Sequence, residues 1–123
     1  MSEEANKKAV LALVDALHRR DAEAWVAAYT EDATVRWMMT GRVIQGREAV
    51  RQWLADIDAI FGNLEDEILG IYADGDTVVL ELVAHSTLAV DYKDKTAGTR
   101  LNAPEVFIYR LVDGKVAEQR CYY

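Results

Sequence analysis

Residues 20–54 constrain the fold more than any other part of the sequence. A short helical segment leads to the sequence Asp-Ala-Thr-Val at 32–35, then to a brief strand-like segment, and then to Gly-Arg-Glu at 46–48, which opens an amphipathic helix. After Gly62 the pattern changes to alternating and β-branched runs, which predict strands. Helices followed by an antiparallel meander indicate an α+β fold in which a sheet packs against helices.

Three helices are predicted in the first half of the chain. The first spans 3–19 with Ser2 as its N-cap, the second spans 22–29 with Asp21 as its cap, and the third spans 47–61. Glycine and asparagine at 62–63 are expected to stop the third helix. The apolar positions that recur at helical spacing are Val10, Leu13, Val14 and Leu17 in the first helix and Val50, Trp53, Leu54, Ile57, Ile60 and Phe61 in the third.

Six strands are predicted. A short hairpin comes between the second and third helices, and four longer strands follow the third. Turns are expected at 74–76, near Lys95 and at 113–114. The predicted strands are 33–38, 42–45, 65–73, 76–91, 99–112 and 115–123.

Composition narrows the class of protein. A chain of 123 residues is expected to form one domain, residues 1–123, and its net charge of −7 argues against nucleic acid or an anionic membrane as a partner. One cysteine, Cys121, permits no internal disulfide, and the acidic N-terminal residues are unlike a signal peptide. Since the chain also lacks a membrane-spanning apolar run, we expect a cytoplasmic protein.

The order of elements, with the sequences at 32–35 and 46–48, resembles the nuclear-transport-factor-2-like superfamily, especially its ketosteroid isomerase and SnoaL-like polyketide cyclase branches. The resemblance implies a cone-shaped fold in which three N-terminal helices pack on a curved antiparallel sheet and enclose one deep apolar pocket. Strong helix formers and a single proline are also typical of an idealised or designed family member.

Strand register predicts which side chains face the pocket. Centring a loop on Lys95 places His85 opposite Glu105 and Glu81 opposite Tyr109. A three-residue turn at 112–114, which the resemblance favours, sets the register of the last strand. A two-residue turn would shift that register by one residue and reverse the faces of the strand. The predicted pocket face carries Val79, Glu81, Val83, His85, Ala103, Glu105, Phe107, Tyr109, Gln119, Cys121 and Tyr123.

The opposite face is more apolar, and an apolar outer face is usually covered, which favours a homodimer through the sheet. Swapped faces, with the apolar set forming the core, are an equal alternative. Pro104 complicates the register, because proline marks a strand edge or a bulge. The predicted outer set is Val78, Leu80, Leu82, Ala84, Val106, Ile108, Val116 and Tyr122.

The favoured function is the binding of an apolar, polycyclic molecule of steroid or polyketide type. Trp37, Met38 and Met39 form an apolar rim that suits a flat guest. By resemblance the catalytic positions of ketosteroid isomerases fall on Leu13, Trp37 and Phe107, which carry no acid or base. The expected ligand-binding residues are Leu13, Leu17, Trp37, Met39, Trp53, Ile57, Glu81, Val83, His85, Glu105, Phe107, Tyr109, Gln119, Cys121 and Tyr123.

An enzyme is the alternative. A carboxylate opposite His85 would favour its charged form, so His85 with Glu105, or a desolvated Glu81, is a candidate acid and base for a SnoaL-like isomerase, cyclase or hydrolase. The same groups could instead only satisfy one another or position a ligand. An interaction module with a filled cone is a third alternative.

No metal or cofactor is predicted. His18 and His85 are far apart in sequence and have no metal-ligand motif around them, and no Gly-rich phosphate loop is present. His18 is interpreted as a surface residue at the end of the first helix. Cys121 is interpreted as a buried structural cysteine.

Overall fold

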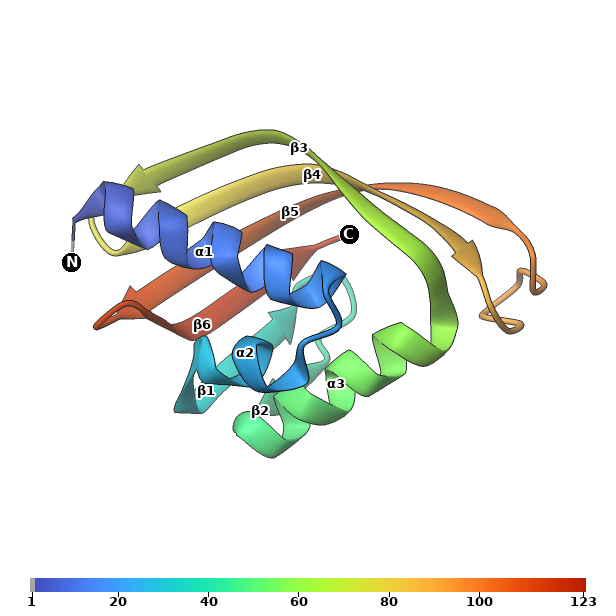
Figure 1. Cartoon of the computed structure of the whole chain (residues 1–123), viewed down its shortest axis with the longest axis horizontal. Coiled ribbons are helices and arrows are strands. Elements are labelled where there is room, and N and C mark those ends of the chain that lie inside the picture. The colour runs from blue at the N-terminus through green and yellow to red at the C-terminus, as the bar shows by residue number, and fades with distance from the viewer. Residues whose placement is uncertain (1) are drawn as a thin grey trace.

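The computed structural model describes residues 2–123, in which three helices and six strands are formed. Figure 1 shows the helices gathered on one side of a curved sheet. The elements are α1 (Glu3–His18), α2 (Ala22–Ala27), β1 (Tyr29–Trp37), β2 (Val43–Gln45), α3 (Arg47–Ile60), β3 (Phe61–Asp74), β4 (Thr77–Leu88), β5 (Arg100–Val112) and β6 (Lys115–Tyr122).

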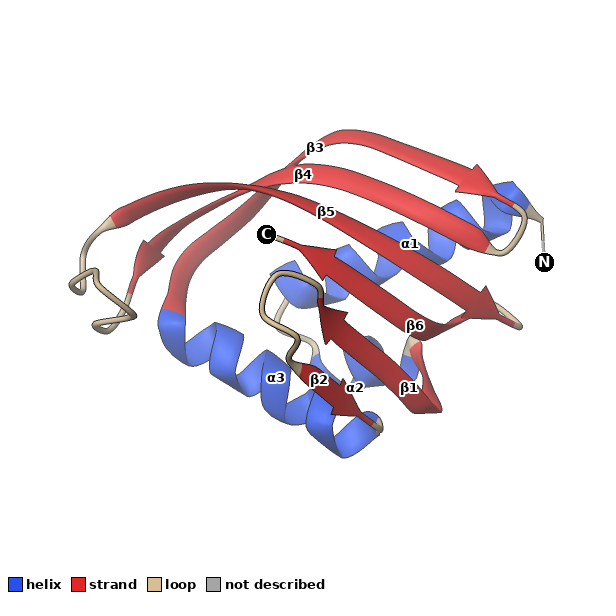
Figure 2. Ribbon diagram, turned by 180° about the vertical axis from the view of Figure 1, so that it is seen from behind, coloured by secondary structure: helices blue, strands red, loops and turns tan. Residues whose placement is uncertain are grey.

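The strands form one sheet in the order β2-β1-β6-β5-β4-β3. Neighbouring strands are antiparallel except for β1 and β6, which are parallel. The sheet, which was predicted to be antiparallel, therefore contains one parallel pair. The sheet curves around the helices (Figure 2), with α1 packed on β3 and β4 and α3 on β1, β2 and β3. The predicted α+β cone is confirmed.

Local sequence signals explain where the helices begin. The Ser2 hydroxyl accepts a hydrogen bond from the Ala5 amide at 3.0 Å, and the Asp21 carboxylate accepts one from the Ala24 amide at 3.1 Å, so both predicted N-caps are confirmed. The end of α3 differs from the prediction. Phe61 already has extended backbone and begins β3 directly, so the chain passes from helix to strand without a loop.

The predicted register of β4 and β5 is wrong. Glu105 lies opposite Leu82 instead of His85, a shift of three residues, and His85 lies opposite Asn102. The cause is the connection, where Tyr92 bridges to Lys95 and Lys93 has a φ of 55°, so the hairpin turns before Lys95. Because three is an odd number, the two faces of β4 exchange roles relative to β5.

The inner face of β4 therefore carries the apolar set. Val78, Leu80, Leu82 and Ala84 are buried beneath the helices, whereas Val79, Glu81, Val83 and His85 lie on the outer face. Val106, Ile108 and Tyr122 lie on the outer face as predicted, and Val116 belongs to the buried core. The homodimer through the outer face stays a prediction.

The β5–β6 hairpin keeps its predicted faces by a different route. Val112 pairs with Lys115, so the turn has two residues, Asp113 and Gly114, both with positive φ (50° and 77°). Alone this turn would reverse the faces of β6. A bulge on β6, where Ala117 lies unpaired opposite Arg110 and Leu111, adds one residue and restores them.

Pro104 lies where β5 has an edge. The pairing of β5 with β6 ends at Val106 opposite Tyr122, and the pairing with β4 runs through Pro104 without a shift. The proline thus lies at a position with no neighbour on the β6 side, which confirms the edge rather than the bulge.

Candidate functional site

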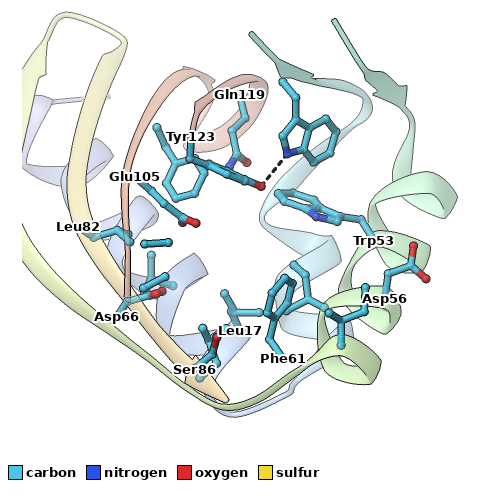
Figure 3. A pocket seen from close by; sticks show the side chains of 18 of the residues that line it. Leu17, Trp53, Asp56, Phe61, Asp66, Leu82, Ser86, Glu105, Gln119 and Tyr123 are labelled. Carbon is cyan, nitrogen blue, oxygen red and sulfur yellow. Dashed lines mark hydrogen bonds between the residues drawn. The ribbon is translucent and has the colours of Figure 1, made fainter. Parts of the chain in front are cut away.

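A cavity of about 800 Å³ lies between the concave face of the sheet and the helices. Figure 3 shows side chains from both sides of it, with Trp53 of α3 facing Glu105 and Tyr123 of the sheet. Most of its lining is apolar or aromatic: Leu13, Val14, Leu17, Trp25, Tyr29, Trp37, Trp53, Ile57, Ile60, Phe61, Leu64, Leu82, Ala84, Tyr92, Leu101, Ala103, Phe107, Tyr109 and Tyr123. A cavity of this size and composition suits a small organic molecule.

Two thirds of the residues expected at the site come together around this cavity. Met39 does not, because it is 73% exposed on the loop after β1, and Cys121 is fully buried outside the lining. Glu81, Val83 and His85 lie on the outer face of β4, away from the cavity, because of the register shift. Those that line the cavity are Leu13, Leu17, Trp37, Trp53, Ile57, Glu105, Phe107, Tyr109, Gln119 and Tyr123.

His85 belongs to a separate polar cluster on the outer face. Its Nδ1 lies 2.6 Å from the Asn102 Oδ1 and its Nε2 lies 3.0 Å from the Glu67 Oε1. The hydrogen bond with Asn102, followed by that with Glu67, raises the pKa of His85. The predicted pair of His85 and Glu105 is therefore wrong, and the acid–base chemistry assigned to it has no geometric basis.

Glu105 is the ionisable group that the cavity changes most strongly. Burial raises the pKa of its carboxyl to about 8, with the nearby charge of Asp66 as a second cause. Among residues 2–123, neither a cation nor a hydrogen bond offsets these two causes. At neutral pH this carboxyl is mainly protonated, and Figure 3 shows it pointing into the cavity.

Asp66 of β3 is a second carboxyl in the lining, and it is not among the site residues predicted from the sequence. Its side chain is 7% exposed, and its Oδ2 lies 3.2 Å from the Nε2 of His18. Burial raises the pKa of Asp66, and the charge and hydrogen bond of His18 oppose that rise. His18 is therefore the partner of a buried carboxyl, not only a surface residue.

The register shift between β4 and β5 brings further residues, not predicted from the sequence, to the cavity. The inner-face residues Leu82, Ala84 and Ser86 line the cavity because the even-numbered side of β4 turns inward. The signal that could have identified them is the strictly apolar composition of that side from Val78 to Ala84, which is typical of a buried strand face.

An aromatic wall closes one side of the cavity. The Trp37 Nε1 donates a hydrogen bond of 2.6 Å to the Tyr123 hydroxyl, the dashed line in Figure 3. Trp37 meets Trp53 edge to face with ring centroids 5.0 Å apart, and Tyr123 meets Phe107 in the same way at 5.8 Å. The four rings form a continuous surface from α3 across to β5.

The deep end of the cavity holds a buried hydrogen-bonded chain. The Tyr29 hydroxyl donates to the Gln119 Oε1 at 2.5 Å, and the Gln119 Nε2 donates to the Cys121 Sγ at 3.7 Å. Burial raises the pKa of the Cys121 thiol to about 12 and holds the pKa of Tyr109 and of Tyr29 well above the ordinary value. These groups stay neutral, so Cys121 is not an activated nucleophile.

The exposed rim carries the cations of the lining. The Arg42 guanidinium lies 4.5 Å from the centre of the Trp37 ring, and the Lys93 ammonium lies 5.3 Å from that of Tyr92. Both basic side chains are exposed. The charge of the lining is therefore separated, with basic groups at the rim and the carboxyls of Glu105 and Asp66 inside.

Within residues 2–123, no group of three or more histidine, cysteine, aspartate or glutamate side chains is arranged to hold a metal ion. None of the helices formed by these residues has the length and apolar character needed to cross a membrane.

Solved structures share this fold. A protein of ketosteroid isomerase-like fold from Catenulispora acidiphila, in complex with trimethylamine, is 25% identical, with a TM-score of 0.80 over 94% of this chain and 84% of the other. A proposed SnoaL-like polyketide cyclase from Jannaschia is 22% identical, with a TM-score of 0.86 over 97% and 85%. An LEH-like epoxide hydrolase from Mycobacterium tuberculosis is 22% identical, with a TM-score of 0.80 over 98% of this chain and 83% of the other.

A comparison with curated protein sequences found no match. Family membership comes from the sequence itself, because residues 10–119 match the SnoaL-like domain over most of the chain. The order of helices and strands and the conical cavity agree with that match. The chain thus belongs to the SnoaL-like domain family, within the NTF2-like superfamily.

Proposed function

We propose that this chain binds an apolar, polycyclic small molecule of steroid or polyketide type in its conical cavity. The observation that carries the proposal is the cavity of about 800 Å³ with its aromatic wall and few polar groups. Apolar burial drives the association, and the polar groups orient the guest. We expect dissociation constants of about micromolar, after the losses that accompany association.

The comparisons support a ligand in this fold. The relative from Catenulispora acidiphila is in complex with a small molecule, trimethylamine. The cyclase and hydrolase functions given to the other two relatives are functions that act on small organic molecules. None of these identities is high enough to transfer a substrate, so the ligand class proposed for this chain rests on its own cavity.

Affinity-selection mass spectrometry tests the proposal. The protein is incubated with a panel of steroids, aromatic polyketides and terpenoid epoxides, and retained compounds are identified by mass and retention time. The variant Ala103→Trp adds a large side chain to the lining of the cavity, whereas Glu81→Trp adds the same side chain on the exposed outer face. We expect retention by the wild type and Glu81→Trp and much weaker retention by Ala103→Trp. Equal retention by all three proteins would exclude the cavity as the binding site.

One observation favours a second candidate, an acid–base enzyme. A carboxyl with a pKa of about 8 inside an apolar cavity exchanges its proton near neutral pH, as a general acid or base requires. Glu105 would carry this role, with Asp66 shaping its pKa. In the same assay, a released compound of altered mass or retention time would support it, and Glu105→Gln would abolish that change while retention persists. Product formed by Glu105→Gln at the wild-type rate would exclude it.

A further inference from the structure

We propose that the cavity selects ring systems that carry a cationic nitrogen, and that the ammonium group lies against the Glu105 carboxylate beside the rings of Phe107 and Tyr123. The inference rests on the proposed function, because it names the class of molecule that the same cavity takes. It is carried by the juxtaposition of one unpaired carboxyl, that of Glu105, and aromatic rings inside the cone.

The charges of the lining favour a cation. Asp56, Asp66 and Glu105 line the cavity, and Asp56 accepts a hydrogen bond from the Gln52 side chain at 2.9 Å. The basic residues of the lining, Arg42 and Lys93, are exposed at the rim. Away from the rim, the lining thus presents, among residues 2–123, the carboxyls of Asp66 and Glu105 and no lysine or arginine.

Glu105 is the lining residue whose ionised form a cationic guest would stabilise most. Its charged form is disfavoured by burial and by Asp66, and no protein cation compensates for either. An ammonium group at this position would supply the missing counter-charge, so the carboxyl could ionise on binding. A ligand carboxylate would instead add a further negative charge beside Asp66 and Glu105, which is unfavourable at short range.

The aromatic wall suits the same guest. Phe107 is two residues from Glu105 on the same face of β5, and Tyr123 meets Phe107 edge to face. Trp37 and Trp53 continue the wall. Ring faces attract cations, and the attraction is larger when both partners are shielded from water. An ammonium beside Glu105 would lie within this wall, and its apolar substituents would occupy the rest of the cavity.

Three naphthalene probes that differ in charge test the inference by calorimetry or by quenching of tryptophan fluorescence. They are trimethyl(2-naphthylmethyl)ammonium, its neutral isostere 2-neopentylnaphthalene, and the smaller carboxylate anion 2-naphthaleneacetate. At pH 8.5 we expect the ammonium to bind at least about tenfold more tightly than the isostere, and the acetate to bind weakest. Equal affinity for ammonium and isostere would overturn the inference while supporting the proposed function. Absence of binding by all three would overturn the inference, and the affinity-selection panel then tests the proposed function separately.

The permanent charge of the ammonium probe makes its pH profile a property of the protein. Because the cation prefers ionised Glu105, its affinity should rise by about tenfold or more from pH 6 to pH 9, while that of the isostere stays flat. The groups around Glu105 are Asp66 with its partner His18, Tyr109, Cys121 and Tyr123. Asp66→Asn and His18→Gln separate the contribution of that pair from the contribution of Glu105.

Glu105→Gln supplies the matched variant. It removes the negative charge with little change of shape, so we expect the preference for the ammonium over the isostere to fall by about tenfold while the isostere binds as before. Glu81→Gln makes the same change on the outer face and should alter neither probe. An unchanged preference in Glu105→Gln, or tightest binding of the acetate, would overturn the inference.

Discussion

The Trp37 Nε1 donates a hydrogen bond of 2.6 Å to the Tyr123 hydroxyl, which ties the end of β1 to the residue that follows β6. β1 and β6 are the parallel pair of the sheet, and Trp37 lies opposite Cys121 in that pairing. The bond therefore fixes the orientation of an indole that belongs to the cavity wall at the point where the two strands meet.

Replacement of Tyr123 by phenylalanine should leave the ring packing intact and the buried Trp37 N–H without its acceptor. An unsatisfied buried donor costs about 1–3 kcal/mol, so we expect the free energy of unfolding to fall by about 1 kcal/mol in urea denaturation. Tyr72→Phe serves as the control, because Tyr72 has a similar exposure (58%, against 48% for Tyr123) and lies on β3, away from Trp37. An equal loss in both variants would show that the hydrogen bond contributes nothing specific.

Tyr29→Phe tests the buried chain at the deep end of the cavity. The change removes the donor of a fully buried hydrogen bond and leaves the Gln119 carbonyl oxygen unpaired. We expect a loss of about 1–3 kcal/mol in the free energy of unfolding. Tyr29→Phe combined with Gln119→Leu should recover part of that loss, because both polar groups are then absent. A double variant that loses the sum of the two single losses would contradict this coupling.

The stability of the fold should depend on pH through Glu105. Its pKa is about 8 in the folded chain and near 4.5 when unfolded, so between these values the folded state binds more protons. The free energy of unfolding should therefore fall as pH rises from about 4.5 to about 8, by a few kcal/mol at most, and level off above that range. Urea denaturation at a series of pH values measures it.

Glu105→Gln is the control for this pH dependence, because its amide does not titrate. The variant should be flatter than the wild type over the same range, and it should be the more stable protein at pH 9. Asp66, whose pKa is also raised by burial, leaves a residual slope of the same sign in the variant. Superimposed pH profiles of wild type and variant would exclude Glu105 as the source.

The helices and the inner faces of β5 and β6 could be predicted from the sequence because their signals are local. Caps at Ser2 and Asp21 lie beside the residues they stabilise. The turn at 113–114 was predicted with three residues and has two. The prediction of which β6 side chains face inward was nevertheless right, because a bulge compensates for the shorter turn. Bulges depend on packing between strands, which a one-dimensional pattern does not record.

The register of β4 and β5 could not be predicted in this way, because the connection folds into a small hairpin of its own between Tyr92 and Lys95. The placement of His85 and Glu81 at the site followed from that register and failed with it. Asp66 was missed for another reason. It lies between Glu65 and Glu67 in what reads as a solvated acidic run, and its partner His18 is far away in sequence.

His85→Ala separates the outer cluster from the cavity. Since His85 contacts Asn102 and Glu67 on the outer face, we expect retention of cavity ligands to be unchanged in this variant. The pKa of His85 should move down toward its ordinary value in Asn102→Ala, because the hydrogen bond with Asn102 is the largest cause of its rise. Ligand retention and an NMR titration measure the two effects. Loss of retention in His85→Ala would contradict the separation.

The contact of His18 with Asp66 joins the end of α1 to β3 beside the cavity, and it opposes the rise that burial causes in the pKa of Asp66. His18→Leu removes the group that lowers the pKa of Asp66, so that pKa should rise further above its ordinary range. A carboxyl ¹³C NMR titration of Asp66 measures the change. Lys7→Leu, on the same helix and away from Asp66, is the control.

A more neutral Asp66 weakens the negative field at Glu105, so the pKa of Glu105 should fall in the His18→Leu variant. A rise in the pKa of Asp66 together with a fall in the pKa of Glu105 would show that the two carboxyls interact across the cavity. A pKa of Glu105 that stays fixed while that of Asp66 rises would show that they do not.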